Sequence, residues 1–526
     1  MIQKLIHRRS SVWEATVVLA VASLVSRIFG LVRDRSLAAH FGAGDVLDSY
    51  FAAFKIPDFI FNLLLLGALS SAFIPLFTEY MQRNGKGEAW SFVNTLINIG
   101  VAVLAVILLT IAIFAPQLAH LIAPGFEPDK LDMTVNLMRI MLLSPLFFGI
   151  SNLAGGILNS FKNFVVYAIA PILYNLGIII GIWWLVPMFG YIGLAYGVVL
   201  GAFMHMLIQI PSVFALGYKY KMHIDWKHPA LKKMAWLMTP RIFGVAAQQL
   251  SLLANTIIAS TLAIGSITVL NLGQNLYSLP VGLFGVSLAI AVFPTLTEKY
   301  TLQKIDEFRD DVMASLKRVL FFIIPTMILY WLLRAQIVRL ILGSGQFGWE
   351  DTRFTVSVLA FLVFGMWAQS IIPLLARSFY ALQDTKTPFI TSLITLATNV
   401  GLALWLIQYY QVVGLAMAIS VSAIVNALIL FIFLYKKLGG FPLRELGDLI
   451  IKSSVGAMTM GLFGYGTLQL MNLIIDTHTF LGLFMQSFVA IVVAAAIYLI
   501  LASRFNLREV NLVLKPLSRI WKRLST

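Results

Sequence analysis

The sequence predicts an all-α polytopic membrane protein with about fourteen transmembrane helices. Of its 526 residues, 60% are hydrophobic and only 12% are charged, and the mean hydropathy is +0.89. A soluble globular domain does not carry so much apolar surface. Continuous apolar runs of about 20 residues recur along the whole chain, which is the length that crosses a bilayer as a helix. Transmembrane β-strands would instead appear as alternating segments of about ten residues.

These apolar runs define the expected spans, with ends uncertain by several residues. They lie at 13–38, 46–80, 90–118, 132–160, 165–187, 190–216, 233–263, 267–297, 312–342, 354–382, 388–409, 412–435, 447–472 and 479–502. Because the spans follow one another closely, we expect no soluble domain of any size.

The loops between the spans alternate in charge. The basic loops carry Arg83 and Lys86; Lys162; Lys219, Lys221, Lys227, Lys232 and Lys233; Lys299, Lys304, Arg309, Lys317 and Arg318; Lys386; and Lys436, Lys437 and Arg444. The acidic loops carry Asp45 and Asp48; Glu127, Asp129 and Asp132, with a single Lys130; Glu350 and Asp351; and Asp476. The positive-inside rule places the basic loops and both termini in the cytoplasm.

The net charge of +15 is explained by this topology, so we expect no nucleic-acid partner. The C-terminal segment 504–526 mixes basic residues with Leu, Val, Ile and Trp521. It is predicted either to lie on anionic membrane lipids as a basic amphipathic helix or to be a solvated tail.

The chain contains an internal repeat. Phe73-Ile-Pro75-Leu-Phe-Thr-Glu79 returns as Phe293-Pro294-Thr-Leu-Thr-Glu298, and Asn175 has a counterpart in Asn399 at a nearly equal offset. Six predicted helices lie between equivalent points, and an even number preserves orientation, so the halves are expected to be parallel repeats around a central cavity. Helix breaks are expected at Pro57 and Gly67 in the second span and at Pro280, Gly282 and Gly285 in the eighth.

The first span contains two arginines, Arg27 and Arg33. On a helix, Ser23, Ser26, Arg27, Gly30, Arg33 and Asp34 fall within an arc of about 120°, opposite an apolar face. A charge at bilayer depth costs several kcal/mol and usually has a function. The face therefore predicts a binding site for something negative. A structural ion pair between Arg27 and Asp34 is the alternative, although it leaves Arg33 unexplained.

Several segments resemble a known family. They are Leu-Val-Ser-Arg-Ile-Phe-Gly-Leu-Val-Arg-Asp (24–34), Phe-Gly-Ala-Gly (41–44), Asp-Ser-Tyr-Phe-Ala-Ala-Phe-Lys-Ile-Pro (48–57), Gly-Ala-Leu-Ser-Ser-Ala-Phe-Ile-Pro (67–75), Ala-Pro-Gly-Phe (123–126), Gly-Ile-Leu-Asn (156–159), Pro240-Arg241, Ala259-Ser260 and Asp-Thr-Lys-Thr-Pro (384–388). Together they are similar to the MurJ (MviN) family of lipid II flippases of peptidoglycan synthesis, within the MOP exporter superfamily. The likeness covers nearly the whole chain, and the first-span block is its most specific part.

The resemblance implies two six-helix lobes around a cationic cavity and an extra helix pair that forms a groove for a polyprenyl tail. We expect an N-lobe at 1–220, a C-lobe at 221–440, accessory helices at 441–503 and the basic tail at 504–526. The family moves undecaprenyl-diphosphate-linked disaccharide-pentapeptide (lipid II) from the cytoplasmic to the outer leaflet of the bacterial inner membrane. It does so by alternating access and without catalysis or a cofactor.

Carried over by position, the resemblance assigns diphosphate binding to Arg27, Arg33 and Lys55, since Arg offers a bidentate fork to phosphate oxygens. Lys55 shares a helical face with Asp48, so it is either a third cation or a partner of Asp48. Polar groups expected in the cavity are Ser26, Asp34, Asp48, Asn62, Gln274 and Asn275.

The chain departs from the family at two places. The family's arginine pair and glutamate on the second helix are replaced by an uncharged stretch, which includes Phe61, Asn62 and Leu66. The arginine of the eighth helix is replaced by Asn275, which follows Gln274. The cavity is therefore expected to be less positive than in typical members, which leaves another polyprenyl-diphosphate glycan as an alternative substrate.

Other function classes are less well supported. A drug or ion antiporter on the related fold would need an unpaired carboxylate in its cavity, and Asp34 and Asp48 both have basic neighbours. A membrane scaffold would tolerate alanine at Arg27 and Arg33. The chain has no Cys, no His-Glu-x-x-His motif and no Walker-type loop, so we expect no metal, no enzyme and no direct use of ATP.

Energy is therefore expected from the membrane potential or from a gradient of Na⁺ or H⁺. Asp384, at the start of the eleventh predicted helix, is a candidate ion ligand. Its simpler interpretation is as an N-cap of that helix.

Overall fold

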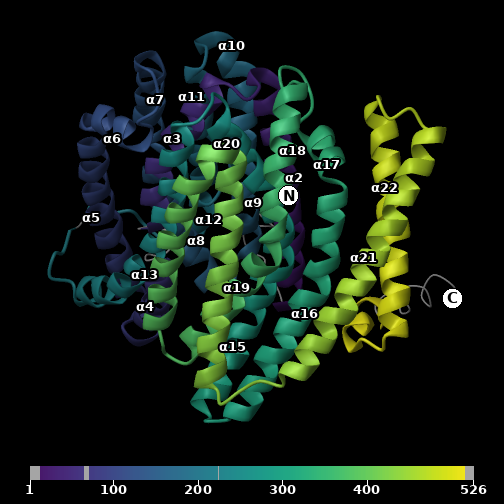
Figure 1. Cartoon of the computed structure of the whole chain (residues 1–526). Helices are drawn as coiled ribbons and strands as arrows, with labels where there is room; N and C mark the ends of the chain where they lie inside the picture. The colour runs from purple at the N-terminus through teal and green to yellow at the C-terminus, as the bar shows by residue number, and fades with distance from the viewer. Residues whose placement is uncertain (1–11, 64–69, 223, 516–526) are drawn as a thin grey trace, which may run out of the picture. The chain divides into compact units, whose positions relative to one another are not determined.

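The computed structural model describes residues 12–63, 70–222 and 224–515, which form helices joined by loops, with no β-strand among them (Figure 1). They divide into two compact units, the first formed by Met1–Thr268 with Ser344–Gly348 and the second by Val269–Gly343 with Trp349–Thr526. The all-α class predicted from hydropathy is confirmed. Gly67 and the last basic residues of the tail, Arg519, Lys522 and Arg523, lie outside the described residues.

The first unit contains the helices up to α13. They are α2 (Val12–Phe41), α3 (Asp45–Ile60), α4 (Ser70–Arg83), α5 (Gly85–Ile113), α6 (Ala115–Ile122), α7 (Pro128–Met141), α8 (Ser144–Ser160), α9 (Phe164–Ile180), the π-helix η2 (Gly181–Leu185), α10 (Val186–Phe189), α11 (Ile192–Leu207), α12 (Ile210–Ala215) and α13 (Pro229–Ser260).

The second unit contains the later helices. They are α14 (Ser266–Pro280), whose first turn belongs to the first unit, the π-helix η3 (Val281–Val286), α15 (Ser287–Thr301), α16 (Ile305–Leu332), α17 (Arg334–Ile341), α18 (Trp349–Phe364), α19 (Met366–Ala381), α20 (Lys386–Lys437), α21 (Leu443–Ile474), α22 (Phe480–Arg504) and the short η4 (Arg508–Val510).

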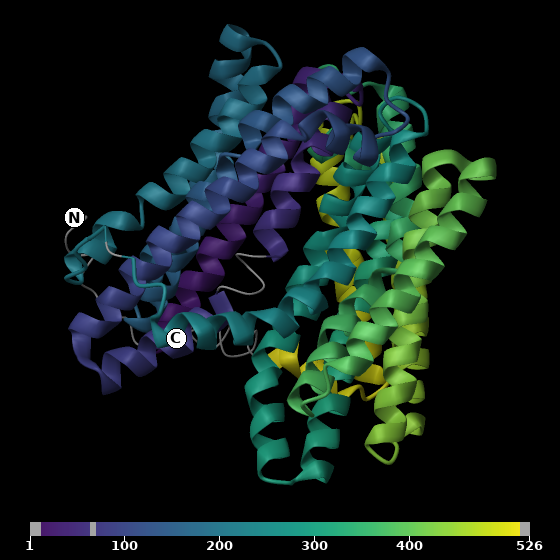
Figure 2. The same cartoon turned by 90° about the vertical axis from the view of Figure 1, so that its left-hand side faces the viewer.

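The helices match the predicted spans, although several spans are divided. Within the described residues, nine helices or continuous helical stretches are long and apolar enough to cross a membrane, or ten if the bent pair α18 and α19 forms one span. α20 counts once but contains two antiparallel segments, because Gln411 has a φ of 52° and reverses the chain. Its halves run side by side from this turn (Figures 1 and 2). The result is compatible with the fourteen predicted spans.

The predicted break in the eighth span is confirmed. α14 ends at Pro280, and Gly282 and Gly285 lie in the π-helix η3 before the chain resumes as α15. Proline removes a backbone donor, so the ladder of hydrogen bonds cannot continue unchanged through this point. Pro57 lies inside α3, which ends three residues later at Ile60.

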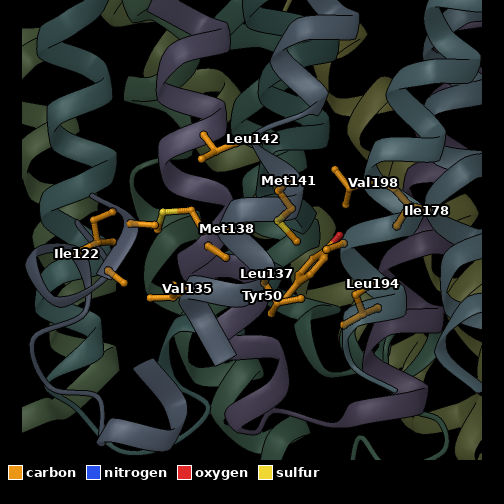
Figure 3. Packing of buried hydrophobic residues seen from close by; sticks show 14 of the residues in the cluster. Tyr50, Ile122, Val135, Leu137, Met138, Met141, Leu142, Ile178, Leu194 and Val198 are labelled. Carbon is orange, nitrogen blue, oxygen red and sulfur yellow. The ribbon is translucent and has the colours of Figure 1, made fainter. Parts of the chain in front are cut away.

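The core of the first unit is apolar, and part of it is built where α3 meets α7. Tyr50 of α3 lies beside Leu137 and Met141 of α7, with Leu194 and Val198 of α11 on its other side (Figure 3). These side chains are fully or almost fully buried. Packing at interior density in a membrane protein supplies the van der Waals contact that holds helices together.

Glycine lets α9 and α11 approach closely. A Cβ added to Gly177 would lie 2.3 Å from the Cα of Gly201, and one added to Gly197 would lie 2.6 Å from the Cα of Gly181. Small residues spaced four apart on both helices allow the two backbones to touch, as in other membrane helix pairs. This contact fixes α9, which carries part of the site described next.

Candidate functional site

Arg33 of α2 is held in a defined position inside the first unit. Its Nε and Nη2 donate to Oδ1 of Asp34 at 3.0 and 2.8 Å, and its Nη1 donates to Oδ1 of Asn175 on α9 at 3.1 Å. The Arg33 side chain is 23% exposed and that of Asp34 is 6% exposed. The charge is therefore compensated by Asp34, while part of the Arg33 side chain stays exposed.

Asn175 connects α9 to α2 beyond its bond to Arg33. Its Nδ2 donates to the carbonyl oxygen of Pro171 at 3.1 Å and, more weakly, to the carbonyl and hydroxyl oxygens of Ser26 at 3.4 and 3.5 Å. Ser26 and Arg33 thus meet at one amide, as expected for two residues on the same polar face of α2. The sequence singled out Asn175 only through the repeat, and its bond to Arg33 had no local signal.

Arg27 lies half-buried on α2, two helical turns before Asp34. Oδ1 of Asp34 accepts from two N–H groups of Arg33. This contact between chain neighbours gives Arg33 a partner that the ion-pair alternative for Arg27 did not provide.

Asp48 of α3 is enclosed in a network of its own and is 2% exposed. Its Oδ2 accepts from Nζ of Lys130 at 2.9 Å and from the amide of Gly265 at 2.7 Å. Its Oδ1 accepts from the amide and the hydroxyl of Thr268 at 2.9 and 2.8 Å. The carboxylate therefore joins α3 and α7 to the first turn of α14, where a negative charge is favoured by exposed amides.

The contacts of Lys130 explain why a single basic residue lies among acidic ones in this part of the chain. Its Nζ is 2.7 Å from Oδ1 of Asp45 and 2.9 Å from Oδ2 of Asp48, and its side chain is only 11% exposed. The lysine neutralises the acidic residues of the preceding loop, so it adds no net positive charge to that end of the unit. Being the one basic residue in an acidic loop was the signal that could have identified this pairing.

Lys55 is half-buried on α3. The carboxylate of Asp48 forms its bonds without Lys55, so the interpretation of Lys55 as the partner of Asp48 is wrong. Asp58, one turn further along α3, is the acidic group that acts on Lys55 electrostatically. Asn62, just beyond α3, donates to the carbonyl oxygen of Asp58 at 2.9 Å.

The other predicted site residues belong to the second unit. Gln274 and Asn275 lie half-buried near the C-terminal end of α14. Asp384 precedes α20, where Oδ1 accepts from the amide of Thr387 at 3.0 Å and Oδ2 accepts from the Thr387 hydroxyl at 2.8 Å and from Nζ of Lys437 at 2.5 Å. This is the geometry of a helix cap with an added ion pair. No cluster of three potential metal ligands occurs in the part of the chain that the structure describes.

The fold defines the class of protein. An inward-facing multidrug resistance MATE transporter of the MOP superfamily has a similar structure, with a TM-score of 0.67, 16% identity, and coverage of 81% of this chain and 98% of that one. A solved "Lipid II flippase MurJ, inward closed conformation" has a TM-score of 0.78 at 26% identity and covers 93% of this chain and 98% of its own. The chain therefore has the fold of MOP-superfamily transporters.

The family follows from the sequence comparisons. The model of the family "Lipid II flippase MurJ" matches residues 37–485, so the chain belongs to this family. A "Probable lipid II flippase MurJ" of Buchnera aphidicola subsp. Acyrthosiphon pisum is 30% identical over 94% of this chain and 98% of the relative. A protein with the same description from Vibrio cholerae is 31% identical over 79% of this chain and 81% of its own length.

Proposed function

We propose that this protein is a flippase that moves the lipid-linked peptidoglycan precursor lipid II from the cytoplasmic to the outer leaflet of the bacterial inner membrane. Membership of the family supports the proposal, and its relatives are described as lipid II flippases over most of the chain. The cargo is a diphosphate on a polyprenyl tail, which needs cations at membrane depth and a path for the tail.

Arg33 is the observation that carries the proposal. Its guanidinium has five N–H groups in a fixed fork, and three of them are engaged by Asp34 and Asn175. The two partners fix the plane of the guanidinium, so the two remaining N–H groups present a preorganised edge to phosphate oxygens. A binding group that is already oriented loses little conformational entropy when the ligand arrives.

Compensation by Asp34 means that Arg33 alone does not neutralise a diphosphate. We therefore include Arg27 and Lys55 as the further cations of the substrate site, with Ser26 and Asn62 as polar groups for sugar or peptide. Asp34 orients Arg33. Asp48, which is enclosed by Lys130, Gly265 and Thr268, acts by holding its helices together instead of contacting the headgroup.

The helix pair α21 and α22 is proposed as the path of the polyprenyl tail. The two helices pack on each other, and α21 also packs on α16 through small residues: a Cβ on Gly464 would lie 3.0 Å from Leu332. Large apolar side chains on the pair are well exposed, including Leu462, Leu470 and Phe488. An isoprenoid chain has the same apolar chemistry, so it can lie along such a surface without desolvating polar groups.

Energy for the cycle is assigned to the membrane potential or to an ion gradient. Moving one charge through the membrane is worth about 2.3 kcal/mol per 100 mV, so a diphosphate headgroup couples strongly to the potential. Na⁺ and H⁺ are the candidate coupling ions, and we propose no catalytic step.

Depletion of the protein in its host tests the substrate. We expect lipid II to accumulate on the cytoplasmic face while its synthesis continues, and we expect wild-type protein but not Arg33→Ala to restore transport. Unchanged lipid II turnover together with accumulation of another polyprenyl-diphosphate glycan would reassign the substrate. Unchanged turnover of all such lipids would favour a drug or ion antiporter.

A further inference from the structure

A second polar cluster lies between α8 and α11 of the first unit and has no part in the site described above. Ser151 of α8 places its hydroxyl oxygen 2.7 Å from Nδ1 of His205 and 3.1 Å from the carbonyl oxygen of His205. Gln209 is fully buried and donates from Nε2 to the Ser151 hydroxyl at 2.6 Å and to the His205 carbonyl at 3.1 Å. Its Oε1 is buried without a hydrogen-bond partner.

The serine hydroxyl allows two protonation states of the imidazole. When Nδ1 has no proton, the Ser151 hydroxyl donates to it, and Gln209 donates to the serine oxygen. When Nδ1 takes a proton from water, Nδ1–H donates to the serine oxygen, and the hydroxyl hydrogen turns to the carbonyl oxygen of His205. Both arrangements use the same atom positions, so adding or removing the proton breaks no hydrogen bond.

His40 shows the contrasting arrangement within the same unit. Its Nδ1 lies 3.0 Å from the carbonyl oxygen of Ser36. A carbonyl only accepts, so the hydrogen of this bond lies on Nδ1 and the bond favours a single tautomer. His205 is therefore different from a histidine that serves only as a fixed donor between two turns of a helix.

The position of His205 makes a proton site functionally relevant. It lies near the middle of the candidate span Ile192–Ala215, formed by α11 and α12. An ionisable residue at this depth is a functional candidate by default. The imidazole is half-buried, so it is not sealed off from its surroundings.

The charged groups on the elements packed against α11 are engaged elsewhere or lie at a helix end. Among these elements, α8, η2, α10 and α12 carry no acidic or basic residue, and α9 contributes Tyr167 and Tyr174. α11 itself adds Tyr196. α7 contributes Asp129 and Asp132, which lie in its first turns. It also contributes Lys130, which binds Asp45 and Asp48. Its remaining charged residue is Arg139, whose Nε donates to the carbonyl oxygen of Ala112. No described carboxylate is therefore in place to hold a proton on His205 permanently.

Aromatic rings connect His205 to the arginine site. Phe148 contacts the imidazole edge-on with ring centres 5.2 Å apart, and it contacts Tyr174 of α9 in the same way at 5.1 Å. Tyr174 is the chain neighbour of Asn175, which binds Arg33. A charge on His205 is thus separated from the anion site by two ring contacts in a medium of low polarity, where it is weakly screened.

We propose that His205, with Ser151 and Gln209, is a proton-binding site that is occupied when an anionic headgroup lies near Arg33. The proton adds a positive charge on α11, which packs against α9, and strengthens anion binding by about tenfold. The coupling to the headgroup rests on the proposed function, whereas the proton site itself stands on the Ser151–His205–Gln209 geometry.

Ring-nitrogen NMR on the full chain in lipid nanodiscs tests the site. As the pH falls from about 8 to 3, we expect His205, assigned by its loss in His205→Gln, to gain a proton at Nδ1, and to do so at a higher pH in the presence of undecaprenyl diphosphate than in its absence. In Ser151→Ala, which retains the imidazole, we expect about a tenfold higher proton concentration to be needed. A His205 ring that does not change over this range, with or without the lipid, overturns the proposal.

Proton uptake on ligand binding separates this inference from the proposed function. On addition of undecaprenyl diphosphate at a series of pH values between about 8 and 3, wild type and the matched control His40→Gln should take up more protons than His205→Gln, at most about half a proton per ligand, because a tenfold coupling changes the proton affinity only tenfold. Equal uptake by all three proteins overturns the coupling. Absence of ligand binding in wild type overturns the lipid-flippase function instead, and the NMR titration without lipid then still decides whether His205 binds a proton.

Discussion

Arg33 depends on its shape as well as its charge. Lysine at this position keeps the charge but has a single nitrogen, so it cannot bind Asp34 and Asn175 in the way that the planar guanidinium does. It also cannot offer two parallel N–H groups to a phosphate. We therefore expect Arg33→Lys to weaken undecaprenyl diphosphate binding at least about tenfold, as measured by a binding isotherm in detergent. Arg83→Lys, at an arginine whose side chain is 78% exposed, is the matched control and should bind normally. Equal affinity in Arg33→Lys would mean that only charge matters at this position.

Asp45 and Asp48 both contact Lys130, but Asp45 forms an ion pair at the surface, whereas Asp48 forms one that is enclosed by the protein. Asp48 is 2% exposed and accepts four hydrogen bonds, whereas the side chain of Asp45 is 51% exposed. Asp48→Asn should destabilise the protein by about 3–5 kcal/mol because it breaks an enclosed ion pair and leaves the buried Lys130 with only the half-exposed Asp45 as its acidic partner. Asp45→Asn should cost less than about 1 kcal/mol. Thermal unfolding followed by size-exclusion chromatography measures both, and similar melting temperatures would contradict the assigned role of Asp48.

The contribution of Asp384 to the stability of the folded protein is expected to depend on pH, and the contacts of Asp384 determine the direction of this dependence. Partial burial by itself would raise the pKa of Asp384, but hydrogen bonds from Lys437 and Thr387 outweigh it and lower the pKa below the ordinary value of 3.8. A lowered pKa in the folded state stabilises the protein above the unfolded pKa, and this contribution is lost as pH falls through the folded pKa. Asp384→Asn should therefore lower the melting temperature at neutral pH, and its difference from wild type should disappear as the pH falls through the lowered pKa of the folded state. A constant difference would contradict the capping role.

The residues of the site differ in how well the sequence could predict them. Arg27 and Arg33 were evident because two arginines in an apolar run are costly without a task. Their partners were not evident, because Asn175 lies on α9, and its bond to Arg33 depends on how two helices pack. Lys55 shared a helical face with Asp48, yet Lys130 from α7 occupies that carboxylate. Spacing within one helix predicts which side chains share a face, whereas the choice of partner depends on other helices.

At the scale of elements, the glycines of α9 and α11 determine how the site is held. A side chain at Gly197 would meet the backbone of Gly181 at 2.6 Å, and backbone cannot move aside as a flexible side chain can. Gly197→Val should separate the helices and destabilise the protein by about 1–3 kcal/mol or more. It should also weaken undecaprenyl diphosphate binding, since Asn175 would move away from Arg33.

Gly100 of α5 provides the control for this substitution. A Cβ there meets nothing within 4 Å, so Gly100→Val changes propensity without causing a clash. The difference from wild type should stay within about 1 kcal/mol. Equal melting temperatures for Gly197→Val and Gly100→Val would mean that the close approach of α9 and α11 contributes nothing to stability.

The elements themselves were largely predictable because each span must bury its own backbone hydrogen bonds in lipid. Hydropathy therefore located the helices, and Pro280 with two glycines located the break that became η3. The π-helix η2 in the fifth span was not predicted. It begins at Gly181, where α9 lies against Gly197 of α11, so it arises where packing between helices, not local sequence, sets the backbone.

At the scale of the whole molecule, the complete absence of cysteine allows the predicted topology to be tested without altering any native thiol. Lys219 follows α12 in a basic loop and is exposed, with its carbonyl held by Nδ2 of Asn94 at 3.2 Å. Glu127 is exposed in an acidic loop before α7. Substitution of either side chain leaves these backbone contacts in place.

The positive-inside rule predicts opposite results at these two positions. In intact spheroplasts, a membrane-impermeant maleimide should label Glu127→Cys, whereas Lys219→Cys should react only after the membrane is permeabilised. A cysteine added at the C-terminus should behave like Lys219→Cys, because both termini are predicted to lie with the basic loops. Labelling of Lys219→Cys in intact cells would invert the topology. The diphosphate would then have to be taken up from the opposite face, so the proposed direction of transport depends on this result.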